Sequence, residues 1–165
     1  MNKYMALLGI LLLAGVSFSV RFPDPYTGYR FEVSDCRADM WYDFFFGAPN
    51  PYWGCASQEL SGQILALDDE LYGDGSPGLL SQMEDTVIAA DECYNGNVDY
   101  ACLARYRQQF RSQQSTFNSL MATGNRLLMQ AGIEAMSGHC VSQQEFLQDY
   151  LDYAYSSAMC NGGRR

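Results

Sequence analysis

One histidine, His139, limits the catalytic chemistry that this sequence can support. A histidine-rich zinc site is excluded, and a mixed Cys–His zinc site would leave unpaired cysteines. A serine nucleophile is expected within a G-x-S-x-G turn, but Asp74 occupies the glycine position before Ser76. His139 lies between Gly138 and Cys140, where we interpret it as a helix-end residue. No catalytic residue is therefore predicted.

Carboxylates are the second group that could perform chemistry. They occur in short runs at residues 68–70, 84–85 and 91–92. General acid–base hydrolysis needs two carboxylates that face each other with perturbed pKa values. Runs at outward positions of predicted helices are typical of a solvated surface instead, so an enzyme is not predicted.

Oxygen ligands for calcium gather in one short segment, and its candidate ligands are Asp91, Asn95, Asn97 and Asp99. The order of an EF-hand loop fails here, because Tyr100 stands where glycine is required and no acid follows at the twelfth position. The competing interpretation is a turn in which Asn and Gly supply the backbone angles. We predict no cofactor, and no metal site beyond this candidate.

The clearest chemical signal is a set of six cysteines: Cys36, Cys55, Cys93, Cys102, Cys140 and Cys160. An even number of cysteines predicts disulfides without a free thiol if the chain is exported to an oxidising compartment, as its first residues indicate below. Cys93 and Cys102 flank a tight turn between two predicted helices, so they should pair. Cys140 and Cys160 bracket the last predicted helix and would be roughly 25–30 Å apart, too far for a disulfide.

Two arrangements remain for the other four cysteines. In an up-down bundle of four helices, the start of the first and the end of the last share a pole. This favours Cys55–Cys160, with Cys36–Cys140 at the other pole. The spacings between successive cysteines, 19, 38, 9, 38 and 20 residues, are nearly palindromic and suit a nested pairing instead, first with last and second with fifth. Saposin-like helical domains nest six cysteines in this way; the similarity covers the pairing pattern alone, because this chain is longer and its terminal cysteines are not close pairs.

The chain from about residue 57 onward shows helical periodicity almost throughout. Ser57 is the predicted N-cap of a helix that ends near residue 72, with apolar residues at helical spacing on one face. The segment GDGSPG, residues 73–78, ends this helix. Ser76 with Pro77 is predicted to start an antiparallel second helix.

Two further helices complete the predicted bundle. Asp99 is the predicted N-cap of a third helix that continues to Met136, with a bend or interruption at residues 122–125. Ser142 and Glu145 form a capping box that opens the last helix. The residues predicted to face the core from this helix are Leu147, Tyr150, Leu151, Ala154 and Ala158. The predicted fold is all-α: a disulfide-stapled, up-down bundle of about four helices.

An aromatic, proline-containing N-terminal arm is predicted to precede the bundle. Residues 20–56 carry four of the five prolines and no sustained helical periodicity, so we expect a non-regular segment along the bundle. Buried, each aromatic side chain would stabilise the fold by about 2–3 kcal/mol; exposed, it would contact a partner or ligand. In an extended chain Phe44 and Phe46 would share one side and Phe45 the other. The aromatic set comprises Trp41, Tyr42, Phe44, Phe45, Phe46, Tyr52 and Trp53.

The first 19 residues are predicted to be a cleaved secretion signal. Lys3 is followed by an apolar run of eleven residues and by small residues ahead of Val20. The run is too short to span a membrane. A single bundle domain of residues 57–160 and a short disordered tail of residues 161–165 are predicted at the other end.

Charge restricts the partners. The formal net charge is −9, and the only lysine lies in the signal, which excludes Schiff-base catalysis in the mature chain. An acidic protein repels nucleic acid and anionic membranes, whereas calcium, mineral surfaces and basic partners are compatible with it.

These observations favour a non-enzymatic protein that acts outside the cell by binding or assembly. The first hypothesis is an acidic extracellular-matrix component, of a mineralised or cross-linked matrix, whose partner is another extracellular protein, the matrix or itself. Its tyrosines would permit oxidative cross-linking. The second hypothesis is a carrier of a small apolar ligand held under the aromatic arm. The third is a small secreted hydrolase or a toxin.

Overall fold

The computed structural model describes residues 25–162 and has an all-α, disulfide-stapled fold. Within these residues the chain forms six α-helices, one short 3₁₀-helix and no strand. Their bounds are Pro25–Phe46 (α2), Pro51–Cys55 (α3), Gln58–Tyr72 (α4), Leu79–Asp91 (α5), Glu92–Tyr94 (η1), Tyr100–Ser137 (α6) and Gln143–Gly162 (α7). The predicted signal lies outside the described residues. Helix α7 extends two residues into the predicted tail, and residues 163–165 lie outside the described range.

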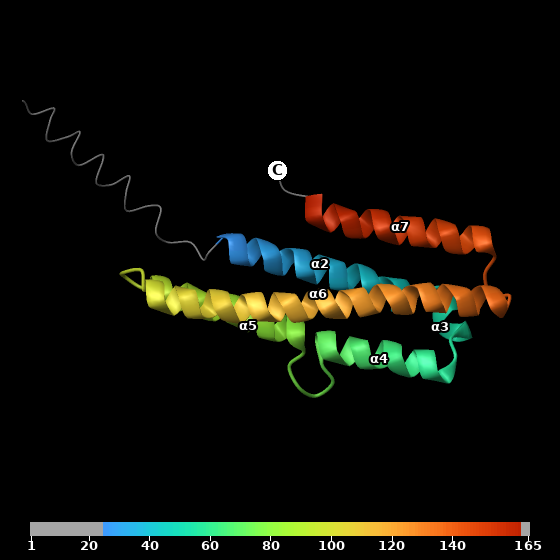
Figure 1. Cartoon of the computed structure of the whole chain (residues 1–165), viewed down its shortest axis with the longest axis horizontal. Coiled ribbons are helices and arrows are strands. Elements are labelled where there is room, and N and C mark those ends of the chain that lie inside the picture. Colours follow the sequence, from blue (N-terminus) through green and yellow to red (C-terminus); the bar gives the residue numbers. More distant parts are fainter. Residues whose placement is uncertain (1–24, 163–165) are drawn as a thin grey trace, which may run out of the picture.

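The long helix α6 is the element on which the others are arranged (Figure 1). Its 38 residues span about 57 Å at about 1.5 Å per residue. Helices α4 and α5 lie end to end beside α6 and run in the opposite direction, and α2 packs antiparallel to α7. The bundle therefore consists of rods that alternate in direction: α2, then α4 with α5, then α6, then α7.

The predicted antiparallel turn between α4 and α5 is wrong, because the chain continues in the same direction after the loop (Figure 1). Gly73 has a φ of 87°, and an added Cβ there would meet the backbone of Ser76 and Gly78. An added Cβ at Gly78 would likewise meet the backbone of Gly73. The two ends of the loop touch, so the loop protrudes from two nearly continuous helices. Ser76 and Pro77 belong to the loop, and α5 begins at Leu79.

The predicted caps are confirmed at three helix starts. Ser57 Oγ accepts a hydrogen bond of 3.3 Å from the Leu60 amide at the start of α4. Asp99 accepts two hydrogen bonds, of 3.0 and 2.9 Å, from amides in the first turn of α6. Ser142 and Glu145 exchange bonds of 2.7 and 3.2 Å as a capping box before α7. These local signals are read correctly from sequence because both partners lie within one turn.

The predicted interruption at residues 122–125 is absent, and α6 is continuous through it. Gly124 is buried there, and an added Cβ would lie 2.7 Å from Trp41 Nε1 and 3.2 Å from Leu67 Cδ2. The glycine therefore allows α2 and α4 to approach α6 closely, and it does not break the helix.

The predicted non-regular arm is wrong over most of its length, since residues 25–46 form α2. Pro25 and Pro51 are the first residues of α2 and α3, where the missing amide hydrogen removes no intrahelical hydrogen bond. Helix α2 packs against α5, α6 and α7. Its buried residues lie on one helical face, but three of the five are polar or small: Thr27, Ser34 and Ala38. The face therefore carries no continuous apolar stripe, and periodicity does not reveal the helix.

Helical spacing decides which aromatic side chains are buried, and the predicted alternation of an extended chain is wrong. Trp41 and Phe45, one helical turn apart, are fully buried, with ring centres 5.1 Å apart. Phe44 and Phe46 lie on either side of this pair and are half-buried. Tyr52 of α3 is buried too and stacks on Phe44 with ring centres 4.8 Å apart. The aromatic stretch is mainly part of the core.

The three disulfides follow the nested pairing: Cys36–Cys160, Cys55–Cys140 and Cys93–Cys102. The predicted bond across the α5–α6 turn is confirmed. The pairs Cys55–Cys160 and Cys36–Cys140 are wrong, because their prediction assumed that α4 and α5 are antiparallel. Since α4 and α5 are collinear, the start of α4 lies at the same end of the bundle as the start of α7 (Figure 1). Cys55 therefore meets Cys140, and Cys160 meets the middle of α2 at Cys36.

Candidate functional site

The polar side chains singled out from sequence are not brought together. His139 is exposed in the α6–α7 turn with a φ of 60°, as a helix-end residue. In the calcium candidate, Asp99 already caps α6, Asp91 is the exposed last residue of α5, and Asn95 and Asn97 are exposed in the connection between the two helices. Within residues 25–162, no three His, Cys, Asp or Glu side chains are grouped as metal ligands.

One group of carboxyl groups is electrostatically coupled around Tyr72. The Tyr72 hydroxyl donates a hydrogen bond of 3.2 Å to Asp39. Burial, together with the charges of Asp39 and Glu84, raises the pKa of Asp35 above its ordinary value. Burial and the neighbouring Asp69 similarly raise the pKa of the Asp68 carboxyl. These shifts show that ionisation of Asp35 and Asp68 is unfavourable to the fold.

The aromatic set is not available as one contact surface. Trp41, Phe45 and Tyr52 are buried in the core and cannot reach a partner while the fold is intact. The side chain of Tyr42 is 42% exposed, and Trp53 is partly buried against the core. The exposed surface of the aromatic set is therefore limited to parts of a few rings.

Helix α7 exposes an apolar row that includes two residues predicted to face the core, Leu147 and Leu151. The side chains that pack inward are Phe146, Tyr150 and Tyr153, so of the predicted inner positions only Tyr150 contacts the core. Ala154 and Ala158 are exposed. Every fourth residue on the outward face is a large apolar one, and we name this row the α7 stripe: Leu147, Leu151, Tyr155 and Met159, exposed by 50, 59, 68 and 53%.

The α7 stripe is presented by a helix that is fastened along its length. Disulfides hold Cys140 just before α7 and Cys160 near its end. The Tyr52 hydroxyl donates a hydrogen bond of 2.6 Å to Asp149, and the Tyr153 hydroxyl donates one of 2.7 Å to Asn125. The inner face is thus held by covalent and polar contacts, which keeps the outer face in one orientation.

The charge of α7 is uniformly acidic. The segment Gln143–Gly162 contains Glu145, Asp149 and Asp152 and no lysine or arginine. The acidic side chains beside the α7 stripe therefore repel another acidic surface.

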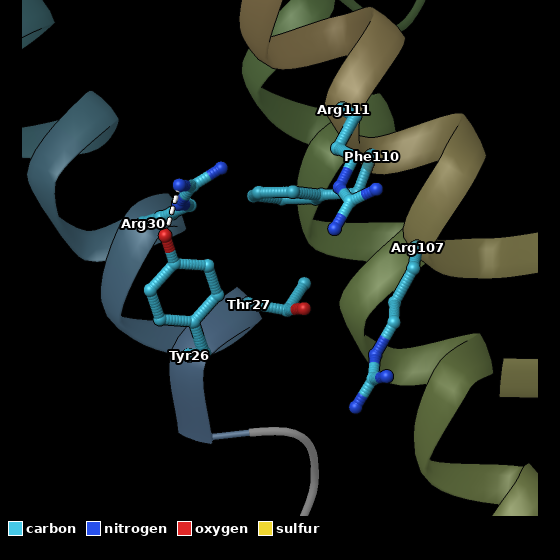
Figure 2. A pocket seen from close by; sticks show the side chains of 6 residues that line it. All are labelled: Tyr26, Thr27, Arg30, Arg107, Phe110 and Arg111. Carbon is cyan, nitrogen blue, oxygen red and sulfur yellow. Dashed lines mark hydrogen bonds between the residues drawn. The ribbon is translucent and has the colours of Figure 1, made fainter. Parts of the chain in front are cut away.

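A second surface site is a pocket between the start of α2 and the first third of α6 (Figure 2). Its volume is about 270 Å³, and we name it the arginine pocket after its lining residues: Tyr26, Thr27, Arg30, Arg107, Phe110 and Arg111. The Arg30 guanidinium lies 4.2 Å from the centre of the Tyr26 ring and donates a hydrogen bond to its hydroxyl. No pattern in the sequence points to this site, because its two halves lie far apart along the chain.

No family model, curated protein or solved structure matches this chain. Among the helices of residues 25–162, none combines the length and the apolar character that crossing a membrane requires.

Proposed function

We propose that this chain is a secreted, non-enzymatic component of an extracellular matrix that binds a protein partner through the α7 stripe. The observation that carries the proposal is the row of large apolar side chains exposed along one face of α7. Single exposed apolar residues are ordinary on protein surfaces. A row at helical spacing is typical of a helix that lies in an apolar groove of another protein.

Two observations support a place outside the cell. The first 19 residues have the pattern of a secretion signal. The three disulfides are of the kind that persists in oxidising compartments. The acidic charge and the exposed phenol of Tyr100 support a role in a matrix, because this phenol lies outside the stripe and is accessible to oxidative cross-linking.

The partner is expected to carry an apolar groove with a basic rim. Burying the exposed halves of the four stripe residues would contribute roughly 3–6 kcal/mol, which reaches only the lower end of the free-energy cost of association, about 4–15 kcal/mol. Apolar contact alone therefore gives weak binding. Basic groups opposite Asp152 and its acidic neighbours would add the remaining affinity and accelerate association. A second copy docked through its own α7 would bring like charges together.

The carrier hypothesis has less support. Its aromatic residues pack on one another, as in the contacts of Trp41 with Phe45 and of Phe44 with Tyr52. Aromatic rings that pack on one another in this way fill the interior between them, and this close packing gives no support to a ligand cavity at that place.

The stripe is tested with two synthetic helical peptides of 20 residues, the length of α7. Both carry leucines on one face; the rim is arginine in one peptide and glutamate in the other. The mature protein is expected to bind the arginine-rimmed peptide at least tenfold more tightly. Leu151→Asp should weaken that binding at least tenfold, because a charge would enter the apolar contact. Leu65→Asp is the matched control, since Leu65 is 50% exposed on α4 and lies outside the stripe.

Three outcomes would contradict the proposal. Equal binding of the two peptides would exclude a basic partner, and equal loss in both variants would exclude the stripe. Self-association of the mature protein that Leu151→Asp abolishes, measured by sedimentation, would make a second copy the partner. Circular dichroism confirms that each variant is folded.

Secretion is tested separately by expressing the full chain in a eukaryotic cell. The protein is expected in the medium with its first residue near Val20, determined by mass spectrometry. Recovery of the protein in the cell fraction, with residues 1–19 still attached to it, would contradict secretion.

A further inference from the structure

The arginine pocket concentrates positive charge in an acidic protein. Three of the six arginines within residues 25–162 line it: Arg30, Arg107 and Arg111. Arg107 and Arg111 are one helical turn apart on α6, where like charges disfavour each other. Arg30 reaches the same pocket from α2, on the opposite wall (Figure 2). A formal net charge of −9 for the whole chain makes this gathering a local exception.

From this arrangement we infer that the arginine pocket binds a sulfate or phosphate monoester. Guanidinium groups are planar forks that hold the oxygens of such groups by paired, charge-assisted hydrogen bonds. Guanidinium groups on two facing helices can approach one tetrahedral anion from both sides. Arg30 is oriented for this by its contacts with Tyr26. Among the described residues, Arg111 is exposed and makes no hydrogen bond or ion pair with another protein group, so its donors are available.

The rest of the pocket matches an ester better than a free ion. A volume of about 270 Å³ exceeds that of one tetrahedral anion. Phe110, which is buried, and the exposed ring of Tyr26 supply apolar surface beside the guanidinium groups. The organic part of the ester would lie against these rings, with an aryl group the best match.

The surrounding charge selects a compact ligand. Screening at physiological salt is effective beyond about 8 Å, so a single anionic group in the pocket experiences mainly the nearby arginines. A long polyanion would extend over the acidic remainder of the surface and be repelled. The site therefore fits one esterified group on a small molecule or on a partner side chain, and not a sulfated polysaccharide or nucleic acid.

The test is isothermal titration calorimetry of the mature chain with phenyl phosphate, phenyl sulfate, inorganic phosphate and heparin. Either aryl ester is expected to bind at one site per chain and more tightly than inorganic phosphate. Arg111→Gln should weaken binding at least tenfold. Arg30→Gln should do the same, and Arg105→Gln is the matched control, because Arg105 is an exposed arginine of α6 that does not line the pocket. The control variant Arg105→Gln should change the affinity less than twofold.

The two esters are distinguished by pH. A phosphate monoester loses its second charge below a pKa of about 6, so its binding should weaken between pH 7 and pH 5, whereas sulfate binding should not. Several results would overturn the inference. One is the absence of saturable binding by either ester. Another is an equal loss in all three variants, which would indicate general charge screening. Heparin binding that is tighter than ester binding would indicate a surface for polyanions in place of a compact site for one ester group.

Discussion

Replacing Gly124 by alanine tests whether α2, α4 and α6 meet as closely as the structure shows. An added Cβ would lie 2.7 Å from Trp41 Nε1, 3.0 Å from Trp41 Cδ1 and 3.2 Å from Leu67 Cδ2. Trp41 and Leu67 are both buried, so neither side chain can move into solvent. A methyl group at this position must displace the indole ring or separate the helices.

Two opposing effects set the magnitude. Alanine is intrinsically better than glycine in a helix by about 1 kcal/mol. Overpacking a close contact costs typically about 1–3 kcal/mol. Gly124→Ala is therefore expected to lower the free energy of unfolding by about 1 kcal/mol. Gly62→Ala is the matched control, since Gly62 is also in a helix but an added Cβ would meet nothing within 4 Å. That variant should gain about 0.5–1 kcal/mol.

The difference in the free energy of unfolding between Gly124→Ala and Gly62→Ala isolates the packing effect, because the gain in helix propensity is common to both variants. It is measured by urea unfolding with the disulfides intact, followed by circular dichroism and tryptophan fluorescence. A difference of about 1–3 kcal/mol is expected. If Gly124→Ala is as stable as Gly62→Ala, Trp41 does not pack on α6 at this position, and the placement of α2 is refuted.

Four other substitutions or measurements follow from the structure. Phe45→Ala should lower the free energy of unfolding by about 3–5 kcal/mol in urea unfolding. Phe44→Ala and Phe46→Ala should lower it clearly less, because both side chains are only half-buried. Equal losses in the three variants would mean that Phe45 is not the inward residue. The raised pKa of Asp35 implies that the folded state holds its proton more tightly, so stability falls as pH rises above about 4. Asp35→Asn should therefore melt higher at pH 7 and like the parent at pH 3; a lower melting temperature at pH 7 would contradict this. His139→Gly should raise stability by about 0.5–1 kcal/mol, because glycine accepts a φ of 60° without strain, and a loss would indicate a side-chain contact instead. Peptide mapping without reduction should recover Cys36 joined to Cys160, whereas any other partner for Cys36 would overturn the arrangement of α2 and α7.

The candidate sites depend on the fold in different ways. Both faces of α7 are apolar at helical spacing, with Phe146 and Tyr150 on one and Leu147 and Leu151 on the other. Periodicity alone cannot choose between them, and the Cys36–Cys160 bond with the Tyr52–Asp149 hydrogen bond turns the first face inward. The arginine pocket joins residues from α2 and α6 that no local pattern connects. Neither site could be assigned from sequence.

The sequence by itself determined what depends on neighbours within a turn or two. Ser57, Asp99 and the Ser142–Glu145 box mark helix starts, because a cap and its amide partners lie in one turn. The Cys93–Cys102 bond follows from a short connection that leaves the two residues no freedom to separate.

Only the tertiary structure decided the direction of α5 and everything that depends on it. Whether GDGSPG reverses the chain or lets it continue is a matter of a few backbone angles, and packing of both α4 and α5 along α6 selects the continuing path. That choice moves the start of α4 from one end of the bundle to the other and so exchanges the cysteine pairs. Helix α2 was missed for a different reason: its buried face contains Thr27, Ser34 and Ala38 before Trp41 and Phe45, so the face is single but its apolar periodicity is weak.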